Sequence, residues 1–209
     1  AESNSLSAAT WSVPGAPSIT SVVAGKQKLT VTYSAATANG STVTGYEYSI
    51  DGGSTWTSAG TSPFDITGLA NATQYTVKMQ AQSALGTGAV ATAAPVTTWA
   101  VPDAPSLTAV TSGDSQLSVE FFPGATGGAT ITDYKYALST NGGGTWSSWT
   151  AAGDAVSPIV VSGLVNGTSY QVKLRAVNEV GDGAESAASS ATTPYTVPSA
   201  PTLGTITPG

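Results

Sequence analysis

The chain repeats itself, and this constrains its fold more than any other feature of the sequence. The pattern Val-Pro-x-Ala-Pro occurs three times, and its first prolines, Pro14, Pro102 and Pro198, are 88 and 96 residues apart. A second pattern, Gly-Leu-x-Asn-x-Thr-x-Tyr, ends at Tyr75 in one repeat and at Tyr170 in the next. Two such units account for nearly all of the 209 residues. The sequence therefore predicts two small domains of one fold rather than a single large domain.

Within each repeat, apolar residues recur at every second position. Apolar and polar side chains alternate over residues 29–33 and 75–81 in the first repeat, and over 117–121 and 170–176 in the second. This period is typical of strands that bury one face, and no segment has a convincing helical period. Gly, Pro and Asn turns separate about seven short strands per repeat. The pattern predicts an all-β fold of two consecutive seven-stranded, immunoglobulin-like β-sandwiches.

The two repeats differ in length close to a predicted hairpin. Asp51-Gly52 and Asn141-Gly142 favour positive φ angles, so we expect each pair to help close a hairpin between the third and fourth strands. The second repeat has seven extra residues after its third strand, which we place between Trp146 and Val156. Surface loops accept such insertions without a change in the framework.

Composition excludes most catalytic chemistry. The chain has no His and no Cys, which removes a Ser-His-Asp triad, zinc sites with His or Cys ligands, and haem or iron–sulfur sites. Six Lys and Arg stand against twelve Asp and Glu, a balance that argues against nucleic-acid binding, and no apolar run is long enough for a membrane helix. Asp182, with Glu179 and Glu185 nearby, is the densest acidic group but has no recognisable calcium-loop motif. We expect no enzyme activity, cofactor, metal, nucleic acid or membrane insertion.

Both repeats resemble fibronectin type III domains of the bacterial or phage extracellular kind. The resemblance rests on the opening Pro-x-x-Pro, the Gly-Leu-x-Asn-x-Thr-x-Tyr pattern, and the Gly-x-Gly segments Gly86-Thr87-Gly88 and Gly181-Asp182-Gly183. It implies that Tyr75 and Tyr170 are tyrosine corners, whose hydroxyls hydrogen-bond back to nearby backbone at the start of strand F. The family usually has Trp in strand B, where this sequence has Tyr or Phe. No Arg-Gly-Asp is present, so that family function is not carried over.

The repeat boundaries predict four segments. Residues 13–100 and 101–196 are the two fibronectin type III domains. Residues 1–12 resemble the last strand of a preceding repeat, and 197–209 resemble the first strand of a following one. Two interpretations of these ends remain open: an excerpt from a longer array, or strands that complete neighbouring copies by strand addition. In either case we expect residues 1–11 and 199–209 to be ordered by contact with something outside the two complete domains.

Aromatic residues supply the candidates for function. Trp11, Trp99 and Tyr195 each stand two residues before a Val-Pro pair, and we interpret them as interdomain joint residues that end strand G beside a stiff linker. A second set consists of Trp56, Trp146 and Trp149, which follow the third-strand hairpins. Exposed Trp rows can stack on sugar rings, so this set is a possible ligand platform. The competing interpretation is that these rings cover the sheet or pack on the hairpin.

Three Asn-x-Ser/Thr triplets are formal glycosylation acceptors, at Asn39, Asn71 and Asn166. Asn71 and Asn166 lie inside the repeated turn motif, where an Asn side chain favours a tight turn. If the source is bacterial or viral, we expect all three to be unmodified.

The first functional hypothesis is a non-catalytic structural spacer, stalk or assembly module of a longer extracellular, cell-surface or virion-surface protein, including a filament-like array. Its partners would be neighbouring repeats or copies of the same chain. The alternative is a carbohydrate- or host-surface-binding accessory module, attached to a secreted glycoside hydrolase or an adhesin and binding surface polysaccharide. The sequence leaves open whether the parent is a wall protein, a secreted enzyme, an adhesin or a phage tail component.

Overall fold

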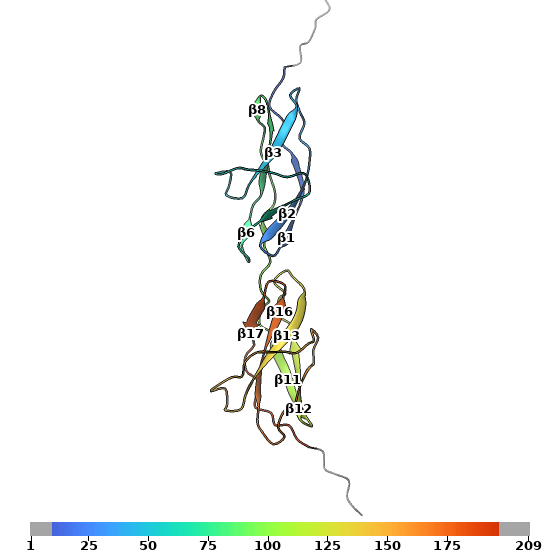
Figure 1. Ribbon diagram of the computed structural model, residues 1–209, viewed down its shortest axis with the longest axis vertical. Helices are drawn as coiled ribbons and strands as arrows, with labels where there is room; N and C mark the ends of the chain where they lie inside the picture. The colour runs from blue at the N-terminus through green and yellow to red at the C-terminus, as the bar shows by residue number, and fades with distance from the viewer. Residues whose placement is uncertain (1–9, 197–209) are drawn as a thin grey trace, which may run out of the picture. The chain divides into compact units, whose positions relative to one another are not determined.

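The computed structural model describes residues 10–196, which form two compact units built from strands (Figure 1). One unit contains residues 10–100 together with Gly127–Ala129, and the other contains 101–126 and 130–196. The division after Ala100 coincides with the boundary of the sequence repeat. The predicted end segments, 1–12 and 197–209, lie almost wholly outside the described residues, so the expectation about their contacts stays a prediction.

The first repeat forms two main antiparallel sheets. One has the order β1-β2-β5, and the other has the order β4-β3-β7-β8 with β9 also paired to β7. The short strands β6 and β10 pair separately with each other. The strand bounds are β1 Ser18–Gly25, β2 Lys28–Ser34, β3 Val43–Ser49, β4 Thr57–Ser58, β5 Phe64–Thr67, β6 Gln74–Tyr75, β7 Lys78–Ser83, β8 Gly86–Thr87, β9 Ala91–Thr92 and β10 Val96–Thr97. The strand predicted over residues 75–81 is thus interrupted between β6 and β7, and the last strand of the repeat consists of the short pieces β9 and β10 after β8.

The second repeat has the same topology with fewer interruptions. Its sheets have the orders β11-β12-β15 and β14-β13-β16-β17, all antiparallel. The strand bounds are β11 Ser106–Gly113, β12 Gln116–Phe122, β13 Ile131–Ser139, β14 Thr150–Ala151, β15 Ile159–Ser162, β16 Gln171–Asn178 and β17 Asp182–Glu185. No helix occurs in residues 10–196. The fold is all-β, as the alternating sequence predicts.

Each repeat encloses its own apolar core between its two sheets. The alternating residues of β2, β7, β12 and β16 supply the inward side chains. The large ones among them that are 0% exposed are Leu29, Val31, Met79, Leu117, Val119, Val172 and Leu174. Burying one such side chain fully stabilises the fold by about 1.5–3 kcal/mol. The rings that stand where the family usually has Trp also pack inward. Tyr33 lies 4.8 Å from Tyr46 and Phe121 lies 4.4 Å from Tyr134, measured between ring centroids.

The register of the third strand corrects the predicted position of the insertion. Tyr46 pairs with Ala81 and Tyr134 pairs with Ala176, so these tyrosines are equivalent. Beyond them, β13 has nine residues where β3 has seven, and its ladder with β16 continues to Ser139. Two of the seven extra residues therefore lengthen the third strand, because the longer ladder moves the turn outward. Only the other five fall in the loop before β15.

The loops after β3 and β13 are closed by an Asp in one repeat and an Asn in the other. Gly52 and Gly142 have positive φ angles of 81° and 70°, as the sequence predicts. The Asp51 carboxylate accepts four hydrogen bonds from Ser49, Ser54 and Thr55. These bonds, above all the one from the Thr55 hydroxyl, hold the pKa of the Asp51 carboxyl well below its usual range. Asn141 accepts bonds from the Ser139 hydroxyl and the Thr145 N–H, so the two loops have one design.

Candidate functional site

The outer face of the sheet β14-β13-β16-β17 gathers cations and indole rings on the second repeat. On β16, Lys173 and Arg175 alternate with the buried Val172, Leu174 and Ala176, so their side chains lie on the face away from the core. Lys135 of β13 pairs directly with Arg175 in the ladder. Three of the six cationic residues of the chain therefore lie on one sheet face.

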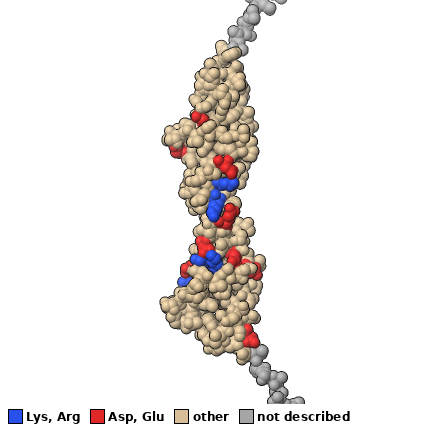
Figure 2. Space-filling view, in the orientation of Figure 1, with Lys and Arg blue, Asp and Glu red and all other residues tan. Residues whose placement is uncertain are grey.

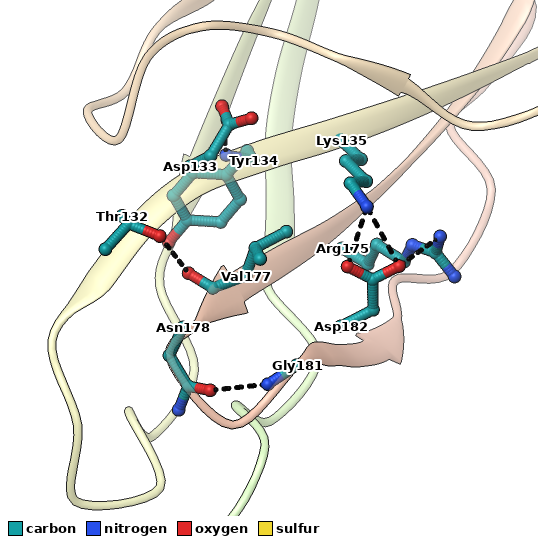
Figure 3. A network of polar contacts seen from close by, with 9 residues as sticks. All are labelled: Thr132, Asp133, Tyr134, Lys135, Arg175, Val177, Asn178, Gly181 and Asp182. Carbon is teal, nitrogen blue, oxygen red and sulfur yellow. Dashed lines mark hydrogen bonds and ion pairs between the residues drawn. The ribbon is translucent and has the colours of Figure 1, made fainter.

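Carboxylates from β17 pair with all three of these cations. Asp182 accepts hydrogen bonds from the Lys135 ammonium at 2.8 and 3.1 Å, and it also forms an ion pair with the Arg175 guanidinium (Figure 3). Glu185 forms an ion pair with Lys173 at 3.2 Å. In Figure 2 the cations of this repeat are accordingly bordered by carboxylates. Because these side chains remain 20–50% exposed, each pair contributes only about 0–1 kcal/mol.

Trp146 and Trp149 stack on the same cations. The Lys173 ammonium lies 4.7 Å from the ring centroid of Trp146, and the Arg175 guanidinium lies 4.4 Å from that of Trp149. Between them, Ser147 donates its N–H to the Leu138 carbonyl and accepts the Leu138 N–H on its hydroxyl. Each of the two cation–π contacts contributes about 0.5–1 kcal/mol, as is usual at exposed sites. Both rings are half-buried, and the predicted binding platform lies against its own sheet.

The segment Trp146–Trp149 acts as a cover for part of this face. Ala137 alternates with the core-packed Tyr136 and Leu138, which places its methyl group on the outer face, yet it is only 1% exposed. We attribute this burial to the tryptophan segment, which is hydrogen-bonded to β13 at the adjacent Leu138. Two buried polar atoms on the face have no partner among the described residues, the Oε1 of Gln171 and the Nε of Arg175. The geometry thus matches the competing interpretation, in which the rings cover the sheet, although a partly exposed edge of each ring remains.

Trp56, the third ring of the predicted platform, occupies the corresponding place in the first repeat. A Cβ placed on Gly53 would lie 3.6 Å from the Trp56 ring and 4.0 Å from the Lys78 side chain. Lys78 donates a hydrogen bond to the Gly52 carbonyl at 2.9 Å. Trp56 therefore lies on its own hairpin and belongs to a different unit from Trp146 and Trp149.

The predicted joint residues tie the end of strand G to the first hairpin of their own repeat. Trp99 donates its N–H to the Gly25 carbonyl, and Tyr195 donates its N–H to the Gly113 carbonyl, both at 3.1 Å. The indole of Trp11 packs on Gly40, where an added Cβ would lie 2.6 Å from the ring. Trp11 and Tyr195 are 69% and 55% exposed, so most of each side chain is uncovered by described residues. Their role as interdomain joints stays a prediction.

Tyr75 and Tyr170 have tyrosine-corner geometry. The Tyr75 hydroxyl accepts the N–H of Ala70, and the Tyr170 hydroxyl accepts the N–H of Val165, both at 3.1 Å and five residues upstream. Tyr170 is 8% exposed and part of the core, whereas Tyr75 is half-buried. The bond therefore lies in a less hydrated place in the second repeat than in the first.

The asparagines of the repeated turn motif act across the repeat rather than within their own turn. Asn71 accepts the N–H of Gln27 on its side-chain oxygen, and Asn166 accepts the N–H of Ser115, both at 2.9 Å. Gln27 and Ser115 have φ angles of 54° and 53° in the first hairpin of each repeat. Each Asn thus holds a left-handed turn residue from a distant loop. The expected turns are present at residues 71–72 and 166–167, and the side-chain oxygens in addition bind the first hairpin of the repeat.

The densest acidic group faces cations rather than an open cavity. Asp182 forms ion pairs with Lys135 and Arg175, and Glu185 forms one with Lys173. Within residues 10–196, no group of three or more His, Cys, Asp or Glu side chains is placed to hold a metal. The same residues include no helix with the length and apolar character needed to cross a bilayer.

The comparisons with known proteins concern the second repeat most directly. Residues 102–192, nearly the whole of this repeat, match the family model of the fibronectin type III domain. A curated relative, neural cell adhesion molecule 1 of Gallus gallus, is 39% identical over 107 residues, which are 49% of this chain and 10% of that protein. The crystal structure of the chicken CNTN1 FN1-FN3 domains is 20% identical with a TM-score of 0.39, covering 88% of this chain and 66% of that one.

These findings bear on the kind of fibronectin type III domain. The curated relative is a chicken protein, so it gives no support to the bacterial or phage kind that the resemblance implied. The chain spans only a tenth of the length of neural cell adhesion molecule 1. What the comparisons establish is the all-β fibronectin type III fold.

Sequence reasoning did not find the cation network beneath the tryptophans. Its signal was present, because Lys173 and Arg175 stand two residues apart on the polar face of a predicted strand. The pairing of Lys135 with Arg175 depends on strand register, and the approach of Asp182 depends on the path of the F–G turn. Neither can be read from one sequence without the structure.

Proposed function

We propose that the chain is a non-catalytic structural module, two spacer domains in tandem, of a longer extracellular or cell-surface protein of the adhesion type. The proposal rests on the contacts made by the candidate binding face, the outer face of the sheet β14-β13-β16-β17. Its cations, carboxylates and indole rings are paired with one another, so the face is built to stabilise its own sheet. Each repeat also encloses a separate core, which lets each fold as a unit in a chain of similar domains.

The curated relative supports an adhesion-type protein as the parent of this chain, but not a particular partner or array. The name of neural cell adhesion molecule 1 places the relative among adhesion proteins, and its match covers a small part of a much longer chain. A repeat without Cys, stabilised by an apolar core, suits a spacer that needs no disulfide. Partners would be neighbouring domains or further copies of the chain. An array on a bacterial or virion surface remains an extension of this proposal with no support from the named relatives.

The second candidate function is glycan binding, favoured by the partly exposed edges of Trp146 and Trp149 on one face. The two functions separate in one experiment. The purified chain is applied to a glycan array and to insoluble polysaccharides, beside a Trp146→Ala/Trp149→Ala variant and a Trp56→Ala control. A spacer shows no specific binding in any of the three proteins. Binding that the double variant loses and the Trp56 control keeps would replace the spacer function with the glycan-binding one.

A further inference from the structure

The second repeat has a groove along the outer edge of β11, and nothing in the proposed spacer function uses it. The groove has a volume of about 730 Å³ and lies between residues 104–110 on one wall and residues 187–190 with Thr192 on the other. None of these lining residues is charged. The corresponding groove in the first repeat, between Ile19–Val22 and Thr92–Ala94, is about 310 Å³. The groove of the second repeat is therefore the larger of the two.

The main chain on the β11 wall is available for pairing. β11 is an edge strand of eight residues, and between Ser106 and Ser112 it pairs only with β12 among the described residues. An edge strand presents a row of free N–H and C=O groups, and natural edges are usually protected by charged side chains or Pro. The sequence of β11, Ser-Leu-Thr-Ala-Val-Thr-Ser-Gly, contains neither.

The opposite wall is irregular because serine side chains take the place of ladder contacts. The N–H groups of Val172 and Leu174 are accepted by the hydroxyls of Ser189 and Ser186 instead of by carbonyls. Residues 186–190 consequently form no strand, although the equivalent part of the first repeat contains β9. In that repeat β1 lies alongside β9 and β10, and the groove between β1 and the β9 segment is the smaller of the two. The flank of β11 lacks a regular strand of this kind among the described residues.

Charge determines which occupant the groove favours. Residues 101–196 carry eight carboxylates and three cations, and all three cations lie on the other sheet. Along the β11 side, the charged residues are Asp103 before the strand, Asp114 after it, and Glu120 on β12. A second copy of the chain, paired antiparallel through β11, would place Asp103 against Asp114 at both ends, and like charges in such positions destabilise pairing. The groove therefore selects against self-association.

We propose that this groove binds an extended peptide segment of another protein as an added strand on β11. The segment is uncharged over about ten residues, has small or β-branched side chains, and carries a Lys or Arg at each end. Main-chain hydrogen bonds to β11 supply the affinity, as in other cases of strand addition. Asp103 and Asp114 receive the basic ends. They are eleven positions apart, which an extended chain spans in roughly 35 Å at about 3.3 Å per residue.

The test uses the full chain and a defined probe. The probe is the peptide Lys-Thr-Val-Thr-Ala-Ser-Thr-Val-Thr-Val-Thr-Lys with blocked ends, whose two Lys residues are as far apart in sequence as Asp103 and Asp114. Binding is followed by ¹⁵N–¹H NMR titration at low salt. One control peptide has Glu in place of both Lys residues, and another has N-methyl groups on alternate amides. We expect saturable shifts confined to residues 104–113 and 187–192. Affinity should be about tenfold weaker for the Glu-ended peptide and should fall with salt, and the N-methyl peptide should show no binding.

A pair of protein variants tests the role of charge. Asp103→Asn/Asp114→Asn should weaken binding of the Lys-ended peptide several-fold. Glu47→Gln/Asp51→Asn, which removes the same charge from the first repeat, should leave it unchanged. The proposal is wrong if the Lys-ended peptide fails to bind at millimolar concentration, if the Glu-ended peptide binds equally well, or if both double variants lose the same affinity. Shifts that map to Trp146 and Trp149, or concentration-dependent dimers in sedimentation without peptide, would also overturn it.

Discussion

Replacing Tyr170 with Phe is the most informative single perturbation of the fold. The change removes one hydroxyl and leaves the ring, so the apolar contacts of the core are preserved. In the structure the lost group is an acceptor, because the Tyr170 hydroxyl receives the N–H of Val165 at 3.1 Å. The variant therefore leaves the Val165 N–H without its acceptor in a partly buried position. The matched change in the first repeat, Tyr75→Phe, strands the N–H of Ala70 in a more hydrated one.

The expected magnitudes follow from this difference in burial. An unsatisfied group that stays away from water costs about 1–3 kcal/mol, whereas a typical hydrogen bond that water can replace contributes about 0.5–1.5 kcal/mol. Tyr170 is 8% exposed and Tyr75 is half-buried. We expect Tyr170→Phe to lower the free energy of unfolding of the second repeat by about 1–3 kcal/mol. Tyr75→Phe should also lower the free energy of unfolding of the first repeat, but this loss should be roughly 1 kcal/mol smaller than the loss caused by Tyr170→Phe.

Urea unfolding followed by ¹⁵N–¹H NMR measures the two repeats separately in the intact chain. Amide signals of β16 report the second repeat and those of β7 report the first. Tyr136→Phe is the control, because the Tyr136 hydroxyl makes no hydrogen bond to a described residue; it should cost little. Losses below about 0.3 kcal/mol in both corner variants, or a larger loss for Tyr75 than for Tyr170, would refute the reasoning.

Two further predictions concern loops. The depressed pKa of Asp51 means that its ionised form stabilises the first repeat above about pH 4, and that this contribution is lost as pH falls through the folded-state pKa. Asp51→Asn should therefore make that repeat less sensitive to acid, because Asn141 closes the same loop in the second repeat without a charge. Acid titration followed by NMR measures the difference. Gly183→Ala should cost about 1–3 kcal/mol in urea unfolding, because its Cβ would lie 2.4 Å from the Pro102 carbonyl oxygen, whereas a cost below about 0.5 kcal/mol would contradict that backbone contact.

The framework of the fold could be predicted from the sequence because it depends on period and spacing. Alternation over residues 170–176 identified a strand with one buried face, and the structure buries Val172, Leu174 and Ala176 completely. The repeated Gly-Leu-x-Asn-x-Thr-x-Tyr pattern located the segment that carries the tyrosine corner. These features are local, so one sequence contains them.

Other features depend on register and on side chains that substitute for backbone, and the sequence could not reveal them. Strand G of the first repeat is the exception, because its break between β9 and β10 lies at Pro95, a residue that offers no N–H and is visible in the sequence. In the second repeat the hydroxyls of Ser186 and Ser189 replace ladder acceptors, and Ser carries no signal that distinguishes this role from an exposed loop. The stacking of Trp149 on Arg175 depends on how the loop crosses the sheet.

Single-molecule force spectroscopy tests the central claim, that the chain is a pair of independent structural modules, most directly. The chain is held by handles at its two ends and stretched at constant speed. Two separate cores predict two unfolding events of similar size, each lengthening the chain by roughly 300 Å, the extended length of one repeat less its folded span. A single event of twice that length, or gradual extension without discrete events, would contradict the account of this chain as two self-contained spacers.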